Sequence, residues 1–225
     1  METANRVLRV VQWTLIAIGA VLIALWIGMR IHGSLGGDAD IRRFEEAQRS
    51  LRQTPPSPTG TPRPTKALSE DYPVNTSLWA EGRIEEYEES LEHQIDPPLA
   101  ILRVPSINLE VAVLVGTSEL VLNRGVGHIE GTPLPGDPGN VGIAGHRDGF
   151  FRGFKDVAKG EVIELETLEA TLEYVITDLY IVDPSDVWVL EPTDVPSLTL
   201  VTCYPFYFVG SAPQRFIVRA ELRES

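Results

Sequence analysis

Three side chains with complementary chemistry stand at the ends of strand-like segments of this chain. Cys203, the only cysteine, follows the apolar run 198–202. His146 follows a second run at 140–145, and Arg215 opens a third. A thiolate is a competent nucleophile near neutral pH, an imidazole can protonate a departing amine, and a guanidinium can stabilise an oxyanion. Together these residues predict acyl transfer through a thiol.

Each of these residues has an alternative in the sequence. His128 also follows a glycine and competes with His146 for the role of general acid. Arg219 lies four residues beyond Arg215 and shares its strand face, because side chains in a strand alternate with a period of two. A lone thiol can also be buried and inert. The residue types alone leave these alternatives open.

The elements that must position these side chains are mainly strands. Segments rich in apolar or alternating residues occupy 99–104, 109–115, 161–165, 171–176 with a continuation through 180–182, 198–203 and 215–222. Glycines and prolines separate them, as is typical of short strands joined by turns. A mostly β domain, folded as a closed or partly closed barrel, is therefore expected.

One helix is expected at the start of the folded part. Its apolar face has residues at steps of three and four, namely Ile84, Tyr87, Leu91 and Ile95. Ser77 is the candidate N-cap, and Pro97 and Pro98 stop the helix.

The order of three motifs carries a resemblance to a known family. The motifs run from Leu122 to His128, from Gly139 to Arg147, and from Thr199 to Cys203 with Arg215 following. In this order they resemble the sortases, membrane-anchored cysteine transpeptidases of bacterial cell surfaces, and the resemblance covers roughly residues 78–222. The stretches 131–136 and 203–206 are most similar to those of class D sortases.

The resemblance implies an eight-stranded β-barrel with short helices, in which Cys203, His146 and Arg215 are the catalytic groups. It implies cleavage of a Leu-Pro-x-Thr-type sorting signal after Thr through a thioacyl-enzyme on Cys203. The acyl group then passes to an amine, such as that of a peptidoglycan precursor or a pilin lysine. The implied partners are surface proteins that carry the sorting signal.

The segment 183–196 matches the loop that borders the substrate groove in this family. Trp188 and Leu190 are its candidate contacts to the signal's Leu and Pro, although Trp188 is equally well interpreted as a core residue. Thr202 and His128 complete the set of candidate substrate-binding residues. Acidic residues occur in the segment, but their spacing matches no calcium loop, so neither a metal nor a cofactor is expected.

The N-terminal part predicts a membrane anchor. Val10 to Met29 contains twenty residues without a charge, enough for a helix of about 30 Å, the thickness of a bilayer core. Arg6 and Arg9 precede this run and only Arg30 follows closely, which favours an N-terminus on the cytoplasmic side. A buried core helix is the alternative interpretation.

Three parts are therefore predicted. Residues 1–31 form a cytoplasmic tip and transmembrane helix, 32–76 an extended Pro-rich stalk, and 77–225 the catalytic barrel. The stretch 55–66, if extended like polyproline, spans on the order of 40 Å. The expected location is the cell membrane, with a single span and an extracytoplasmic catalytic domain.

The net charge and the order of the candidate residues exclude several other classes of protein. The formal net charge is −13, and basic residues outnumber acidic ones before residue 32, so the remainder is strongly acidic and nucleic acid is not an expected partner. Papain-like enzymes place the cysteine before the histidine, the reverse of this order, and the residues after Cys203 lack the pattern of L,D-transpeptidases. Another thiol hydrolase, or an anchored binding domain without activity, remains as an alternative.

Overall fold

The computed structural model describes residues 13, 41–42, 44–46, 74–208 and 210–223. The chain divides into two compact units, Met1–Gly36 and Gly37–Ser225, and Trp13 is the one described residue of the first. The membrane span predicted at 10–29, apart from Trp13, and the Pro-rich stretch 55–66 lie outside the described residues. Where the chain is described, no helix has the length and apolar character needed to cross a membrane.

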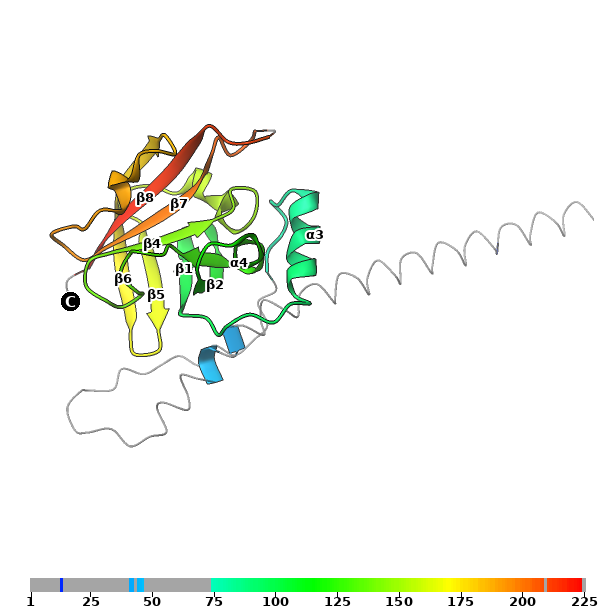
Figure 1. Ribbon diagram of the computed structural model, residues 1–225, viewed down its shortest axis with the longest axis horizontal. Helices are drawn as coiled ribbons and strands as arrows, with labels where there is room; N and C mark the ends of the chain where they lie inside the picture. Colours follow the sequence, from blue (N-terminus) through cyan, green and yellow to red (C-terminus); the bar gives the residue numbers. More distant parts are fainter. Residues whose placement is uncertain (1–12, 14–40, 43, 47–73, 209, 224–225) are drawn as a thin grey trace, which may run out of the picture. The chain divides into compact units, whose positions relative to one another are not determined.

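Eight strands of the second unit close into a barrel (Figure 1). They are β1 (Ala100–Val104), β2 (Leu109–Val115), β3 (Val126–His128), β4 (Asn140–Gly145), β5 (Val162–Thr167), β6 (Thr171–Val182), β7 (Ser197–Tyr204) and β8 (Gln214–Leu222). Their order around the barrel is β1-β2-β3-β4-β7-β8-β6-β5, and β5 pairs with β1 to close it. This confirms the predicted mostly β fold and the eight-stranded barrel.

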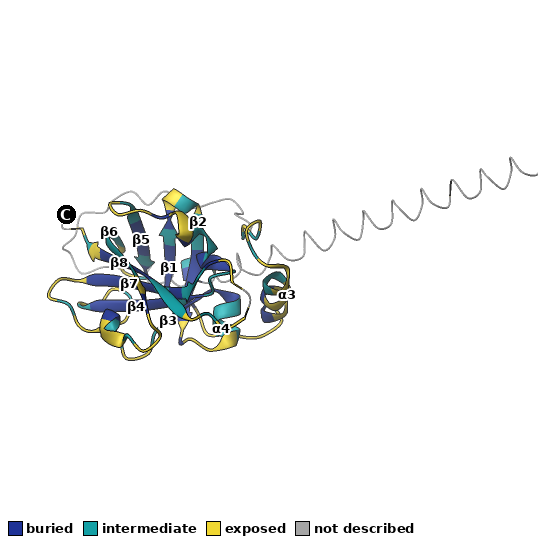
Figure 2. Cartoon of the chain, turned by 90° about the horizontal axis from the view of Figure 1, so that it is seen from above, coloured by how far each residue is buried: buried dark blue, intermediate teal, exposed yellow. Residues whose placement is uncertain are grey.

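Alternation of side chains builds the barrel core. In β5, Ile163 and Leu165 are fully buried, whereas Val162, Glu164 and Glu166 are only partly buried. By contrast, β4 is buried at every position except Ala144, and β7 is buried from Ser197 to Leu200, so both faces are covered along these stretches (Figure 2). Strands covered on both faces read as continuous apolar runs, which explains why 140–145 and 198–202 stand out in the sequence.

Two of the pairs of neighbouring strands, β2 with β3 and β4 with β7, are parallel. The remaining pairs are antiparallel. A parallel pair brings the carboxyl ends of both strands to the same edge of the sheet. For β4 and β7, these are the ends that precede His146 and contain Cys203.

Within residues 74–223 the helices are short. They are α3 (Glu81–Ser90), α4 (Glu119–Arg124) and the 3₁₀ helices η1 (Pro105–Ile107), η2 (Phe150–Asp156) and η3 (Val187–Leu190). The predicted cap at Ser77 is wrong: Ala80 is the N-cap of α3, because Thr76 to Trp79 form a turn closed by a 2.9 Å backbone hydrogen bond. The helix α4 was not expected from the sequence, although Ser118 caps it by accepting from Val121 N.

An aromatic cluster attaches α3 to the barrel. Tyr87, only 1% exposed, meets Trp79 and Phe150 edge to face, and Trp79 meets Phe150 with ring centroids 4.6 Å apart. Such pairs contribute about 0.5–1.5 kcal/mol each beyond the burial of their area. Since Phe150 begins η2, the cluster fixes α3 beside the turn that follows His146.

Part of the segment predicted as a stalk is also described. Phe44 is 1% exposed and packs with Ile101, Ala112 and Leu114 on the β1–β2 side of the barrel.

Candidate active site

The parallel pairing of β4 and β7 brings His146 and Cys203 to one edge of the barrel. Gly145 of β4 is paired with Thr202 of β7. His146 directly follows Gly145, and Cys203 directly follows Thr202. The Thr202 hydroxyl donates a 2.7 Å hydrogen bond to the Gly145 carbonyl oxygen, so it links the two strands at this point. Thr202 is 2% exposed, which places this predicted substrate-binding residue inside the strand pair.

Arg215 lies directly opposite Cys203 in the antiparallel pair of β7 and β8. Side chains opposite one another in such a pair share a face, with Cβ atoms about 4.5–5.5 Å apart. Arg215 Nη1 donates to the carbonyls of Gln214 at 3.0 Å and Ala212 at 3.4 Å. Among the described residues, its other guanidinium nitrogens have no hydrogen-bond partner, so they are available to an oxyanion beside the thiol.

His146 is mostly enclosed, and its surroundings favour the neutral imidazole. Burial, followed by the positive charge of Arg83, lowers its pKa from the ordinary value of 6.5, while Glu119 and Asp148 act in the opposite direction. Glu119 Oε1 lies 3.3 Å from Nε2 but off the hydrogen-bonding direction. Nε2 is therefore buried without a hydrogen-bond partner among the described residues, and it can take or give a proton during a reaction.

An apolar surface continues from the thiol along the outer face of the barrel. Val201, Ile217 and Tyr180 form the row next to the one that contains Cys203 and Arg215. Val189 and Leu190 of η3 pack on this row. This places the predicted groove residue Leu190 on the same face as the thiol.

Trp188 lies at the outer side of η3. The residue is 46% exposed, and its ring meets Tyr180 edge to face, with centroids 5.5 Å apart. It is therefore a partly exposed surface residue that covers Tyr180.

A set of buried polar groups holds η3 in place. The Val189 carbonyl oxygen accepts from Asn140 Nδ2 at 3.1 Å, Thr199 Oγ1 at 3.3 Å and Arg219 Nη2 at 2.5 Å. Arg219, the rival to Arg215 in the sequence, thus points to η3 and lies two rows away from Cys203 on the same strand face. Asn140 and Thr199 were not predicted as site residues, although polar residues within apolar runs are the signal that reveals such a set.

His128 is also placed by the structure. It is 6% exposed, and its Nε2 lies 2.9 Å from the Pro133 carbonyl and 3.1 Å from Thr132 Oγ1. Thr132 in turn donates to the Ile129 carbonyl and accepts from Gly142 N. These bonds connect His128 with the turn 129–133 and with β4.

Two arginines join the segment after His146 to the segment after Cys203. Arg147 donates to the carbonyls of Pro205, Phe208 and Gly210 at 3.3, 3.0 and 3.0 Å. Arg152 donates to the Phe206 carbonyl and lies 4.1 Å from the centroid of the Tyr207 ring. Neither contact was predicted from the sequence, since the acceptors are backbone carbonyls, which have no signature in the sequence.

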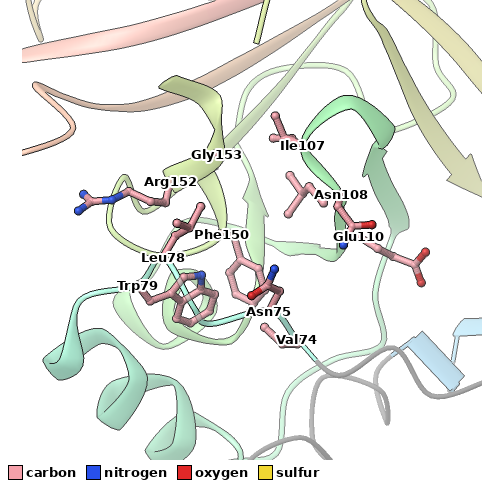
Figure 3. A pocket seen from close by; sticks show the side chains of 12 residues that line it. Val74, Asn75, Leu78, Trp79, Ile107, Asn108, Glu110, Phe150, Arg152 and Gly153 are labelled. Atoms are coloured by element: carbon pink, nitrogen blue, oxygen red, sulfur yellow. The ribbon is translucent and has the colours of Figure 1, made fainter. Parts of the chain in front are cut away.

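The described part of the chain has no group of three or more metal-ligating side chains. A small pocket of about 60 Å³ lies between residues 74–79 and the turns η1 and η2 (Figure 3). Neither Cys203 nor Arg215 lines it, and Arg152 directs its guanidinium away from it. The pocket is therefore separate from the candidate active site.

Comparison with known proteins agrees with the fold. The sortase domain family model matches residues 102–223, and the chain belongs to the sortase family. This confirms the resemblance seen in the sequence.

Individual relatives point to the same family. The chain is 36% identical to sortase D of Bacillus subtilis over 119 residues, which cover 52% of this chain and 60% of the relative. It is 32% identical to Listeria monocytogenes sortase A over 134 residues, covering 58% and 59%. The matched segments thus span about three fifths of these relatives. Among solved structures, a Clostridium perfringens sortase D5 transpeptidase superposes with a TM-score of 0.53 at 30% identity, covering 62% of this chain and 88% of that one.

Proposed function

We propose that this protein is a sortase-type cysteine transpeptidase that cleaves a Leu-Pro-x-Thr-type sorting signal after Thr and transfers the acyl group to an amine. The observation that carries the proposal is the register of β7. On one side of this strand Cys203 is paired with Arg215 of β8, and on the other side Thr202 is paired with Gly145, the residue before His146. The similarity to sortase D and sortase D5 supports assignment to class D.

The first half of the reaction forms a thioester. The Cys203 thiol passes its proton to His146, and the thiolate attacks the carbonyl carbon of the signal's Thr. Arg215 donates hydrogen bonds to the oxyanion of the tetrahedral intermediate. When the C–N bond breaks, the imidazolium of His146 returns the proton to the departing amine. The acyl group then remains on sulfur.

The second half transfers the acyl group. An amine attacks the thioester carbonyl, neutral His146 accepts a proton from that amine, and the C–S bond breaks to release the Cys203 thiolate, which regains the proton. A lowered pKa of His146 favours this second role, because the neutral imidazole is the form that accepts a proton. The acceptor amine belongs to a peptidoglycan precursor or a pilin lysine.

The signal's apolar residues bind on the surface next to the thiol. Val201 provides its floor beside the buried Ile217, and Leu190 forms its border. Trp188, His128 and Thr202 complete the proposed set of substrate-binding residues. Trp188 is the one among them with a large exposed apolar surface.

The test uses the full-length chain in detergent micelles with a peptide that contains the signal and an added amine. We expect peptide cleavage, an amide product with the amine, and a thioester on Cys203 detected by mass spectrometry. Cys203→Ala should abolish all three while the folded barrel remains. Cleavage by Cys203→Ala at the wild-type rate would falsify the assignment. A thioester that only water resolves would favour a thiol hydrolase, and a chain that forms no adduct would favour a binding domain.

The proposed location is the cell membrane, with the barrel outside the cytoplasm and residues 10–29 as the span. Protease added to intact cells, or to spheroplasts of a host with an outer membrane, should release the part beyond the Pro-rich stretch. Full protection of the barrel in spheroplasts would contradict this orientation.

A further inference from the structure

A residue of α3 reaches the His146 turn from outside the segment that the family model matches. Arg83 is 14% exposed, and its Nε donates to Asp148 Oδ1 at 3.2 Å. Its Nη1 lies 3.6 Å from Glu119 Oε1 and donates to Asn123 Oδ1, both in α4. Arg83 therefore connects three parts of the chain: α3, α4 and the turn after β4.

The backbone shows that this approach is built into the turn. Ala80 N–H donates to the Asp148 carbonyl at 3.3 Å, so the N-cap of α3 is tied to the same turn. A Cβ placed on Gly149 would lie 3.3 Å from Arg83 Cγ and 3.5 Å from His146 Cβ. A glycine at this position thus leaves the space in which the aliphatic part of Arg83 lies close to His146.

Glu119 completes the link to the imidazole. Its Oε1 lies 3.3 Å from His146 Nε2 and 3.6 Å from Arg83 Nη1. The Glu119 side chain is 70% exposed, so Arg83 restrains a carboxylate that is otherwise free to move into solvent. In Figure 1, α3 and α4 lie side by side at the edge of the barrel.

We propose that Arg83 is a positioning residue of this active site, which orients the His146 turn through Asp148 and holds Glu119 beside the imidazole. The proposal rests on the proposed transpeptidase function for its effect on rate. It makes α3 part of the catalytic unit, although α3 lies before residue 102, where the family match begins.

If Arg83 positions the groups around His146, its removal should change the pKa of His146, which a purely structural role of Arg83 would not do. Arg83 and Glu86 face it from α3, Glu119 from α4, and Asp148 from its own turn. The positive charge of Arg83 lowers the pKa of His146, whereas the three carboxylates raise it. Removing Arg83 should therefore raise the pKa of His146, and removing Glu119 should lower it.

The experiment measures the pKa of His146 by NMR in the full-length chain labelled at its four histidines, with His146→Gln to assign the signal. Arg83→Gln should raise the pKa and Glu119→Gln should lower it. Arg83→Lys should keep the pKa near that of the wild type but lose the Nε hydrogen bond to Asp148. Because this readout needs no substrate, it stands even if the proposed transpeptidase function fails.

A matched control separates this effect from general destabilisation. Arg103 of β1 is 13% exposed and is ion-paired with Glu110 and Glu166, away from the site. Arg103→Gln removes the same charge and should lower stability without changing the pKa of His146. An equal pKa in Arg83→Gln and Arg103→Gln would overturn the proposal.

Kinetics provide the second readout. Arg83→Gln should lower the kcat of transpeptidation about three- to thirtyfold, a part of the hundred- to ten-thousandfold that a positioned general acid contributes. The pH profile of kcat should shift upward in Arg83→Gln and downward in Glu119→Gln. Unchanged kcat and an unchanged profile in folded Arg83→Gln would also overturn the proposal. Absence of transfer by the wild type would instead refute the proposed function.

Discussion

Thr202 donates its hydroxyl to the Gly145 carbonyl over 2.7 Å, and this bond lies one residue before both His146 and Cys203. It joins the last paired residues of β4 and β7 from within the barrel wall. Any slip between these two strands would move the imidazole relative to the thiol. The strand register is therefore a direct determinant of the geometry of the candidate active site.

Thr202→Val tests the importance of this bond. Valine keeps the shape and strand preference of threonine but leaves the Gly145 carbonyl without its side-chain donor. We expect a loss of about 1–3 kcal/mol in the free energy of unfolding. We also expect kcat to fall about tenfold or more, because small misplacements of reacting groups are costly. Urea denaturation and peptide kinetics measure the two effects.

Thr202→Ser is the matched control, since it restores the hydroxyl. It should recover most of the lost stability and rate. A Thr202→Val enzyme as stable and as fast as the wild type would show that the β4–β7 register does not depend on this bond.

Arg215→Lys separates charge from geometry at the proposed oxyanion site. Lysine keeps the charge but loses the planar fork of donors, so the variant should remain severely impaired. Loss of one such donor typically costs about 3–4 kcal/mol, or on the order of a hundred- to a thousandfold in rate. Steady-state kinetics with a signal peptide provide the measurement.

Arg219→Ala is the neighbouring comparison. Arg219 donates to the Val189 carbonyl and so supports η3. This variant should keep more than about a tenth of the wild-type kcat, well above the loss expected for a missing oxyanion donor, while KM rises because η3 borders the proposed groove. A greater loss of kcat at Arg219 than at Arg215 would move the oxyanion role to Arg219.

The lowered pKa of His146 predicts a dependence of stability on pH. Burial and Arg83 lower this pKa below 6.5 in the folded protein, so near that pH the unfolded chain binds more protons than the folded one. The contribution of His146 to the free energy of unfolding is complete above its pKa of 6.5 in the unfolded chain. It is lost as the pH falls through its lower pKa in the folded protein. Urea unfolding of wild type and His146→Gln at pH 7.5 and at lower pH tests this.

In that experiment, the stability of His146→Gln should decline less on acidification than that of the wild type. His93→Gln, at an exposed position after α3, is the control and should behave like the wild type. Parallel declines in all three proteins would contradict the prediction.

Gly145→Ala should disturb the core next to the site. An added Cβ would lie 2.7–2.9 Å from atoms of the Phe151 ring, which is fully buried and stacked on Phe154. Since the ring has no room to move away, we expect a destabilisation of about 1–3 kcal/mol. Thermal and urea unfolding measure it.

Gly82→Ala is the opposite case. Gly82 lies in α3 with no atom within 4 Å of an added Cβ, so alanine should stabilise the helix by about 0.5–1 kcal/mol. If both variants lost stability equally, close packing at Gly145 would not be the cause of its effect.

The sequence alone was sufficient for the fold class and for the family. The alternation of β5 and the apolar runs of β4 and β7 identify strands because the period of a strand is local and survives in any context. The motifs around His146, Cys203 and Arg215 indicate the family, which the family match confirms. The strand β3, three residues long, is too short to carry an alternating pattern.

Only the tertiary structure decided which of these residues meet. His146 and Cys203 lie 57 residues apart, and their approach depends on the parallel pairing of β4 and β7. Arg83 and Asp148 lie 65 residues apart, and nothing in either local sequence indicates that they form an ion pair. Arg215 and Arg219 share a strand face, but the acceptor that engages Arg219 is a backbone carbonyl of η3. Pairing register and backbone acceptors depend on contacts between distant segments, so residue types and spacing do not encode them.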